Sequence, residues 1–324
     1  MSDEANAASP DVQTTATAAV AFQSILINGL PEWLLTDAAT LRAHSAFQDA
    51  LQLYATSMIS QFEAEPERVH AVSEEALLFV GLAVSAMYLT RDPADPRSGA
   101  TAARARTFAV RAGLASPNRV SAYVGLMMRL GYWRQVEAPI DRRIKLLEPT
   151  EKATLLSQTY ITMAHQTLKL LYANIDYINL LQSDPDFRGR AAVEAVHQYL
   201  EGVRIPRAVP DASFFMDQVA GRQVMFKLWL AFVQQGDGSC IINYPYERLA
   251  ASFRVSRAHI RRMMEEGQER GLFTLHAPGG RRIEILPKFV KLQETVGSLI
   301  FTQFKREVDV AAATTGRGRI VWGV

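Results

Sequence analysis

Residues that could bind a nucleic acid gather in the segment Glu247–Phe273. Ser256 is placed to cap a helix there, because its hydroxyl can accept a hydrogen bond from a backbone N–H of the first turn. Spacings of three and four predict a buried face, made of Ile260, Met263, Met264 and Gly267. The polar face begins with four side chains that could contact bases and phosphates, namely Arg257, His259, Arg261 and Arg262.

Arginines at a helix start oppose the helix dipole, which favours an anionic partner over the alternative of a merely solvated amphipathic helix. A sister segment, Thr107–Tyr132, has Ser116 as its cap and Pro117 at the first helical position. Its outward residues Asn118, Arg119 and Ser121 are of types that bind base edges or phosphates. Each segment therefore predicts a recognition helix.

A β-hairpin is predicted after each of these helices, over Tyr132–Leu147 and Leu272–Leu286. The first has Pro139 and Asp141 at its turn, and the second has Gly279-Gly280. Paired arginines follow both turns, Arg142-Arg143 and Arg281-Arg282. Such a pair suits a wing that contacts phosphate or the minor groove, whereas a solubilising turn is the alternative.

The two segments belong to an apparent internal repeat, with a shift of about 140 residues. The landmarks that coincide are Phe47 with Phe187, Ser73 with Ser213, Gly81 with Gly221, Ser116 with Ser256, Val120 with Ile260, and Gly131 with Gly271. Chance matching of two unrelated helical segments is the alternative. The join is expected near 173–185, where polar residues and Pro185 interrupt the helical pattern.

The periodicity predicts a mainly α fold with small β-hairpin wings. We expect two winged helix-turn-helix domains plus connecting, dimerisation-type helices, related by a pseudo-two-fold. Helices are expected at 39–61, 74–88, 101–111, 116–130 and 149–171, then at 191–200, 212–235, 245–253, 256–270 and 289–304. The expected domains are a disordered tail (1–18), a first repeat (19–175, winged helix about 74–148), a second repeat (176–310, winged helix about 212–287) and a C-terminal tail (311–324).

Composition excludes several classes of protein. The net charge is only +2, from 35 Lys and Arg against 33 Asp and Glu. Between 97 and 145, however, ten cations face only Glu137 and Asp141, which is the footprint of phosphate binding. The single cysteine fits a reducing compartment, so we expect a cytoplasmic protein, and the scattered histidines predict no metal site. The sequence has no catalytic or cofactor-binding motif, so we expect neither an enzyme nor a bound cofactor. It has no apolar segment of membrane-spanning length, so we expect no membrane partner.

The chain resembles winged-helix transcription regulators, in particular the multiple-antibiotic-resistance regulator (MarR) family. The residues that carry the resemblance are Leu114–Val120, Leu130–Trp133, Asp141–Arg143 and the Leu147–Thr150 turn before a long helix. The resemblance implies sequence-specific binding of double-stranded DNA. Family members are usually single-copy chains that dimerise, so a duplicated chain implies a pseudo-dimer with two unlike recognition helices, as a monomer or a homodimer, and a site that is not a perfect palindrome.

Two alternatives stay open, a plasmid-type replication initiator and a winged-helix module for protein interaction. The resemblance also leaves open a small-molecule effector, for which Phe214–Met216 and Met225–Phe232 could line a pocket if they are not simply core. The sequence does not give the operator, the sign of regulation or the role of the C-terminal tail.

Overall fold

The computed structural model describes residues 25–65, 75–95, 97–172, 177–235 and 239–315. These residues are mainly helical, with two small antiparallel sheets, which confirms the coarse expectation of a mainly α fold with short hairpins. The disordered tail expected at 1–18, the end of the C-terminal tail from 316, and Ser73 lie outside the described residues.

The first half of the chain forms helices that lead to a hairpin and then to a long helix. The elements are α2 (Glu32–Arg42), α3 (Phe47–Ala64), α5 (Glu75–Leu89), α6 (Ala102–Arg111), α7 (Pro117–Arg129), β1 (Trp133–Glu137), β2 (Lys145–Pro149) and α8 (Glu151–Leu171). Strands β1 and β2 pair antiparallel, with Trp133 opposite Pro149. Thr150 caps α8 by accepting a hydrogen bond from the N–H of Ala153.

The second half follows a similar order. Its elements are α9 (Ile178–Ser183), α10 (Pro185–Leu200), α11 (Ile205–Ala208), α12 (Pro210–Met216), α13 (Gly221–Val233), β3 (Ile241–Ile242), α14 (Tyr246–Phe253), α15 (Arg257–Glu269), β4 (Phe273–Ala277), η2 (Pro278–Gly280), β5 (Arg282–Ile285) and α16 (Pro287–Ala313). Helix α15 and strand β4 begin about 140 residues after α7 and β1.

Two of the expected helices are interrupted in the structure, and other elements differ from the expectation. Residues 43–46 break the helix expected over 39–61, and residues 217–220 break the helix expected over 212–235. At the second break Ala220 adopts a left-handed φ of 62°, and a Cβ on Gly221 would lie 1.7 Å from the carbonyl oxygen of Phe215. The sheet of the second half also has a third strand, β3, which the sequence did not indicate. In addition, α10 begins earlier and α16 ends later than expected.

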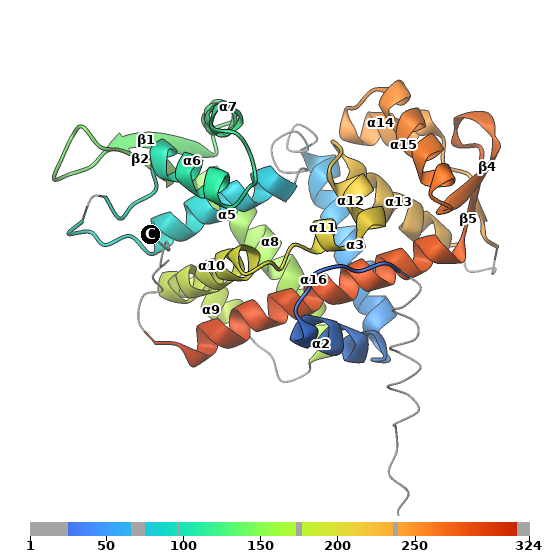
Figure 1. Ribbon diagram of the computed structural model, residues 1–324, viewed down its shortest axis with the longest axis horizontal. Helices are drawn as coiled ribbons and strands as arrows, with labels where there is room; N and C mark the ends of the chain where they lie inside the picture. The colour runs from blue at the N-terminus through green and yellow to red at the C-terminus, as the bar shows by residue number, and fades with distance from the viewer. Residues whose placement is uncertain (1–24, 66–74, 96, 173–176, 236–238, 316–324) are drawn as a thin grey trace, which may run out of the picture.

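Two lobes project from a common helical body (Figure 1). We call residues 101–149 (α6, α7, β1, β2) the first lobe and residues 239–285 (β3, α14, α15, β4, η2, β5) the second lobe. The lobes lie at the two upper ends of the molecule in this view, and α16 runs along the body beneath them. Among the described residues, no helix is both long and apolar enough to cross a membrane.

The two halves exchange packing partners inside the body. Helix α3 packs on α13 of the other half, and α10 packs on α5 of the other half. Tyr54 of α3 and Phe226 of α13 meet edge-to-face with ring centroids 5.8 Å apart, while Phe79 of α5 lies 4.0 Å from Tyr199 of α10. Within each half, α3 packs on α8 and α10 packs on α16. One continuous core therefore includes both halves.

Candidate nucleic-acid interface

Helix α7 begins at the cap that the sequence predicted. The Oγ of Ser116 accepts a hydrogen bond from the N–H of Arg119 at 3.3 Å, and Pro117 occupies the first turn. The inward face consists of Val120, Tyr123, Val124 and Met127. The predicted contact residues Ser116, Asn118, Arg119 and Ser121 are all exposed along the first turns. The Oγ of Ser121 donates to the carbonyl of Pro117 at 3.0 Å.

Close contact with α5 fixes α7 on its support. Tyr123 is buried, and its hydroxyl would lie 2.9 Å from a Cβ added to Gly81. A side chain at position 81 would therefore require this hydroxyl to shift. Burial raises the pKa of Tyr123, so this hydroxyl stays neutral. The outward side chains of α7 are therefore presented by a helix whose inner face is tightly held.

The first hairpin presents two almost fully exposed cations. The side chains of Arg142 and Arg143 are 89% and 96% exposed, and their nearest carboxylates are Glu137 at 3.6 Å and Asp141 at 3.8 Å. Glu137 also accepts a hydrogen bond from Lys145 at 2.7 Å. Ion pairs between such exposed groups are weak. Both arginines are therefore available to an anionic partner.

Helix α15 matches α7 in its cap and in its buried face. The Oγ of Ser256 accepts from the N–H of His259 at 3.1 Å, and the predicted buried residues Ile260, Met263, Met264 and Gly267 are all buried. Carboxylates of the second lobe lie beside two arginines of this helix. Arg257 pairs with Glu247 at 2.8 Å, and Arg261 lies 3.6 Å from Glu265.

His259 does not point freely outward as the sequence suggested. Its ring is half-buried, and Nε2 lies 2.9 Å from the carbonyl oxygen of Val219, in the turn before α13. The helical periodicity predicted on which face of α15 His259 lies, but not its contact with Val219, which is distant in the sequence. Arg262 is exposed, and it borders a surface hollow of about 410 Å³ whose other lining residues are Glu265, Glu266, Glu269 and Arg270.

The second hairpin carries Arg281 and Arg282 at its exposed edge, as predicted. Its turn contains Gly279 and Gly280 at φ of 74° and 82°. A Cβ at Gly280 would lie 2.2 Å from the carbonyl oxygen of Tyr244, so this turn requires glycine against the β3–α14 connection. Across β4 and β5, His276 contacts Glu284 at 2.7 Å. The hairpin is thus well supported beneath its two arginines.

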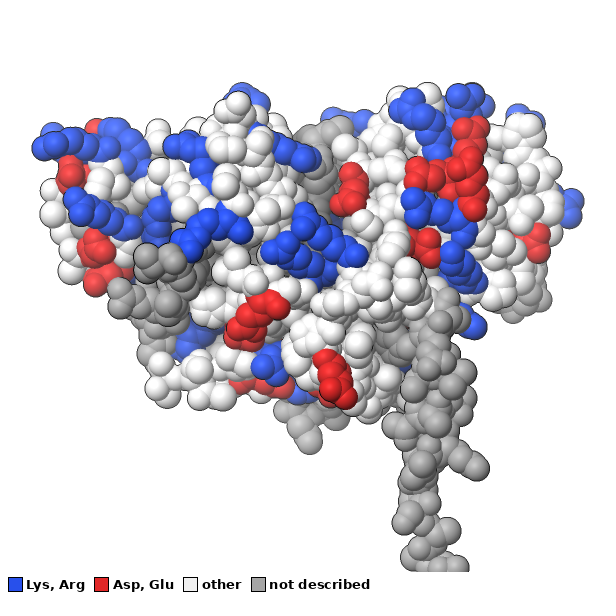
Figure 2. All heavy atoms as spheres, in the orientation of Figure 1, with Lys and Arg blue, Asp and Glu red and all other residues white. Residues whose placement is uncertain are grey.

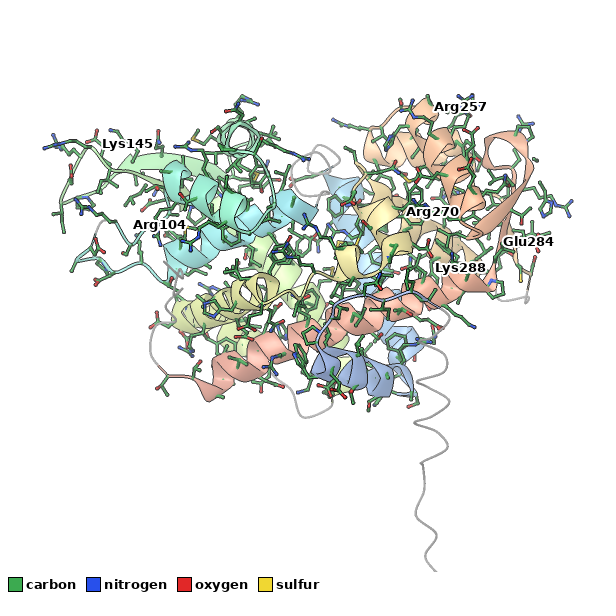
Figure 3. The ribbon with its side chains drawn as sticks, in the orientation of Figure 1. Arg104, Lys145, Arg257, Arg270, Glu284 and Lys288 are labelled. Carbon is green, nitrogen blue, oxygen red and sulfur yellow. The ribbon has the colours of Figure 1, made fainter. Side chains whose placement is uncertain are left out.

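One cation of the basic stretch at 97–145 stabilises a loop. The guanidinium of Arg104 donates to the carbonyl oxygens of Ser98 and Gly99, and partial burial lowers its pKa. Figure 3 shows Arg104 within the first lobe, whereas Lys145 lies at its outer edge. Arg104 therefore holds the loop that precedes α6, and the stretch has fewer available cations than the sequence count suggested.

Charge is distributed unequally between the lobes. In Figure 2 Lys and Arg gather along the upper edge over both lobes, and a strip of Asp and Glu crosses the front of the second lobe. Of the side chains that line the hollow on α15, Glu265, Glu266 and Glu269 are acidic. Residues 101–149 contain nine Lys and Arg against three Asp and Glu, whereas residues 239–285 contain eight against five. The electrostatic attraction for phosphate is therefore expected to be stronger at the first lobe.

Neither protein-family models nor curated proteins nor solved structures match this chain. The described residues contain no group of three or more His, Cys, Asp or Glu side chains that could hold a metal ion. The aromatic residues that the sequence suggested for an effector pocket, Phe214 and Phe215 with Phe226 and Trp229, are buried core residues. Sequence reasoning also missed Asp211, Arg270 and Lys288, which form a charge cluster under α15.

Proposed function

We propose that this protein binds double-stranded DNA as a sequence-specific transcription regulator. In this proposal each lobe is a winged helix-turn-helix unit, with α7 and α15 as recognition helices and the β1–β2 and β4–β5 hairpins as wings. The chain then acts as a pseudo-dimer that contacts two half-sites. We also propose that the protein is similar to MarR-type regulators. We do not propose a small-molecule effector.

The observation that carries the proposal is the matched arrangement in the two lobes. In each, a short helix and a turn precede a serine-capped helix, and a hairpin with two exposed arginines follows it. Both lobes lie on the same side of the body (Figure 1). Two exposed helices on one side of a molecule can enter successive major grooves of one duplex, which lie about 34–36 Å apart.

The unlike helices predict an asymmetric site. Asn118 and Arg119 lie near the start of one helix, and His259 and Arg261 lie near the start of the other. Asparagine favours adenine and arginine favours guanine in the major groove. Since the two lobes differ in these residues and in charge, the preferred sequence should have two different half-sites.

Selection from sheared genomic DNA of the source organism tests the proposal. The enriched fragment is titrated with protein at several salt concentrations. Saturable binding that weakens steeply with salt is expected, because each neutralised phosphate releases a counterion. Failure to enrich any fragment, with only weak binding that is lost near physiological salt, would overturn the proposal in favour of a protein-interaction module. A strictly palindromic optimum would contradict the asymmetric pseudo-dimer.

A further inference from the structure

A single carboxylate holds the ends of two helices beneath the second lobe. Asp211 of α12 has a side chain that is only 17% exposed, with Lys288 Nζ at 2.8 Å from one oxygen and Arg270 Nη1 at 3.7 Å from the other. Lys288 also donates to the carbonyl oxygen of Arg270 at 2.8 Å. Arg270 is the C-cap of α15, and Lys288 lies in the first turn of α16. Figure 3 shows Arg270 and Lys288 on the side of the second lobe that faces the body.

Further contacts tie α15 to the same part of the body. The guanidinium of Arg270 lies 4.7 Å from the ring centroid of Phe214 on α12. Near the other end of α15, His259 contacts the carbonyl of Val219. The turn that contains Val219 is closely packed, since Ala220 has a left-handed φ and a Cβ on Gly221 would lie 1.7 Å from the carbonyl oxygen of Phe215. Both ends of α15 are thus attached to α12 and to the turn after it.

The first lobe contacts the same short stretch of chain. Arg207 of α11 donates to the carbonyl oxygen of Gly113 at 3.0 Å, in the turn just before α7. Helix α10, which leads into α11, packs along α5 beneath the first lobe. Residues 205–216, which form α11 and α12, therefore touch the turn before one candidate recognition helix and the end of the other.

We propose that Asp211 is a positioning residue, which fixes α15 on α12 through Arg270 and Lys288, and that residues 205–216 thereby set the separation between α7 and α15. The attachment of α15 to α12 follows from the contacts of Asp211, Arg270 and Lys288. Its consequence for DNA rests on the proposed function. A fixed separation selects half-sites at one spacing, since each added base pair moves a half-site by about 3.4 Å. A loosened second lobe would tolerate other spacings.

The distance between the lobes can be measured without DNA. Cys240 is the one cysteine of the chain and is exposed in the second lobe, and Val110 is 50% exposed on α6 of the first lobe. Spin labels at Cys240 and at Val110→Cys give a distance distribution by pulsed electron resonance. A single narrow distribution is expected for the parent protein. Asp211→Asn should broaden or shift it, because Lys288 loses its carboxylate and Arg270 keeps only Glu266 of its own helix, at 2.8 Å.

The matched control is Glu294→Gln. Glu294 is similarly covered (20% exposed) and pairs with Arg42 at 3.5 Å, but it joins α16 to α2 within the body, away from both lobes. This control should leave the distribution unchanged. Lys288→Met provides a second test if Asp211→Asn does not fold, and it should broaden the distribution in the same way. A distribution equal to the parent's in both variants would overturn the positioning role.

The role in spacing is tested by measuring the affinity for the selected DNA site with one or two base pairs inserted between its half-sites. The parent protein should lose affinity by roughly tenfold, within the usual range for coupled sites. Asp211→Asn should lose much less, while its affinity for a single half-site stays at the parent value. A broadened distribution in a protein that binds no DNA would uphold the positioning role and overturn the proposed function. Tight binding that ignores spacing in the parent would overturn the spacing role.

Discussion

The arginine pair on the first hairpin is where single side chains should matter most for DNA binding. Arg142→Ala with Arg143→Ala removes two cations that are 89% and 96% exposed. If each contacts one phosphate, the slope of log K against log salt should become less negative by about 1.8 for B-DNA. Affinity should fall for all sequences alike, since phosphate contacts do not report base identity.

A matched control separates contact from overall charge. Lys169→Ala with Lys291→Ala removes the same charge from α8 and α16 of the body. The salt slope of this control should stay near the parent value in titrations of the same duplex. Equal slopes for the arginine variant and the parent would show that the first hairpin does not contact phosphate.

Packing at residue scale gives a second prediction, on stability. A Cβ at Gly267 of α15 would lie 2.2 Å from the ring of Phe273, which is buried in β4. Gly267→Ala should therefore lower the free energy of unfolding by about 1–3 kcal/mol in urea titrations. Gly125→Ala in α7 meets only the flexible end of Arg129, at 3.4 Å, and should raise it by roughly 0.5–1 kcal/mol. The opposite order would contradict the packing described for α15.

The sequence predicted which side chains of a helix are buried more reliably than it predicted which residues they contact. Periodicity placed Ile260 and Met263 inside α15 correctly, because burial repeats with the helical turn. The contact of His259 with Val219 and the hydrogen bonds of Arg104 with its loop depend on segments brought together by the tertiary fold. Local spacing contains no signal for such partners.

At the scale of elements, the serine caps should determine how firmly each candidate recognition helix begins. Ser116 and Ser256 each accept a backbone N–H that would otherwise lack a partner in the helix. Ser116→Ala and Ser256→Ala should each lower the free energy of unfolding by about 1 kcal/mol. Ser157→Ala, in the middle of α8 and exposed, should change it by less than about 0.5 kcal/mol. Cap variants that behave like Ser157→Ala would contradict the assigned helix starts.

Element boundaries were predictable where a capping residue or a turn residue marks them. Ser116, Ser256 and Gly271 marked α7 and α15 to within one residue. The break at 217–220 has no proline and no glycine before Gly221, and Ala220 adopts a conformation that its type rarely takes. Strand β3 has only two residues, which is too short for alternation to show. These elements depend on packing that the local sequence does not encode.

At the scale of the whole molecule, one carboxyl in the body should make stability depend on pH. Desolvation between α10 and α16, reinforced by the carboxylate of Glu194, raises the pKa of Glu307 to about 8, against 4.5 ordinarily, although a hydrogen bond from Gln303 opposes this. Glu194 itself is hydrogen-bonded to Gln198 and lies 3.8 Å from Arg306. Between these two pKa values the folded state holds a proton that the unfolded chain lacks.

The contribution of Glu307 to the free energy of unfolding should therefore fall as the pH rises from about 5 to about 8, because at this residue the unfolded state binds fewer protons there. Glu307→Gln cannot ionise, so its stability relative to the parent should increase over the same interval. Urea unfolding at about pH 5 and about pH 8 measures this difference. If the difference in free energy of unfolding between Glu307→Gln and the parent were the same at both pH values, the raised pKa of Glu307 would be contradicted.

The exchange of packing partners is the whole-molecule feature that the sequence could not predict. The repeat indicated two similar halves, but it did not indicate that α3 would pack on α13 and α10 on α5. Such pairing depends on which apolar faces meet over long sequence separations, and the spacing of apolar residues along one helix does not identify its partner. Helix positions are therefore local information, whereas the assembly of the body is not.

This exchange has a consequence for how the two lobes can change over time. In a symmetric homodimer, a mutation in the DNA-contacting helix changes both copies of that helix. A heterodimer avoids this, but its two subunits must not form homodimers. Here each half completes the core of the other within one chain, so partner choice is settled by covalent connection. If the proposed function holds, substitutions in α7 and in α15 can accumulate independently, and each lobe can specialise for its own half of an unequal site.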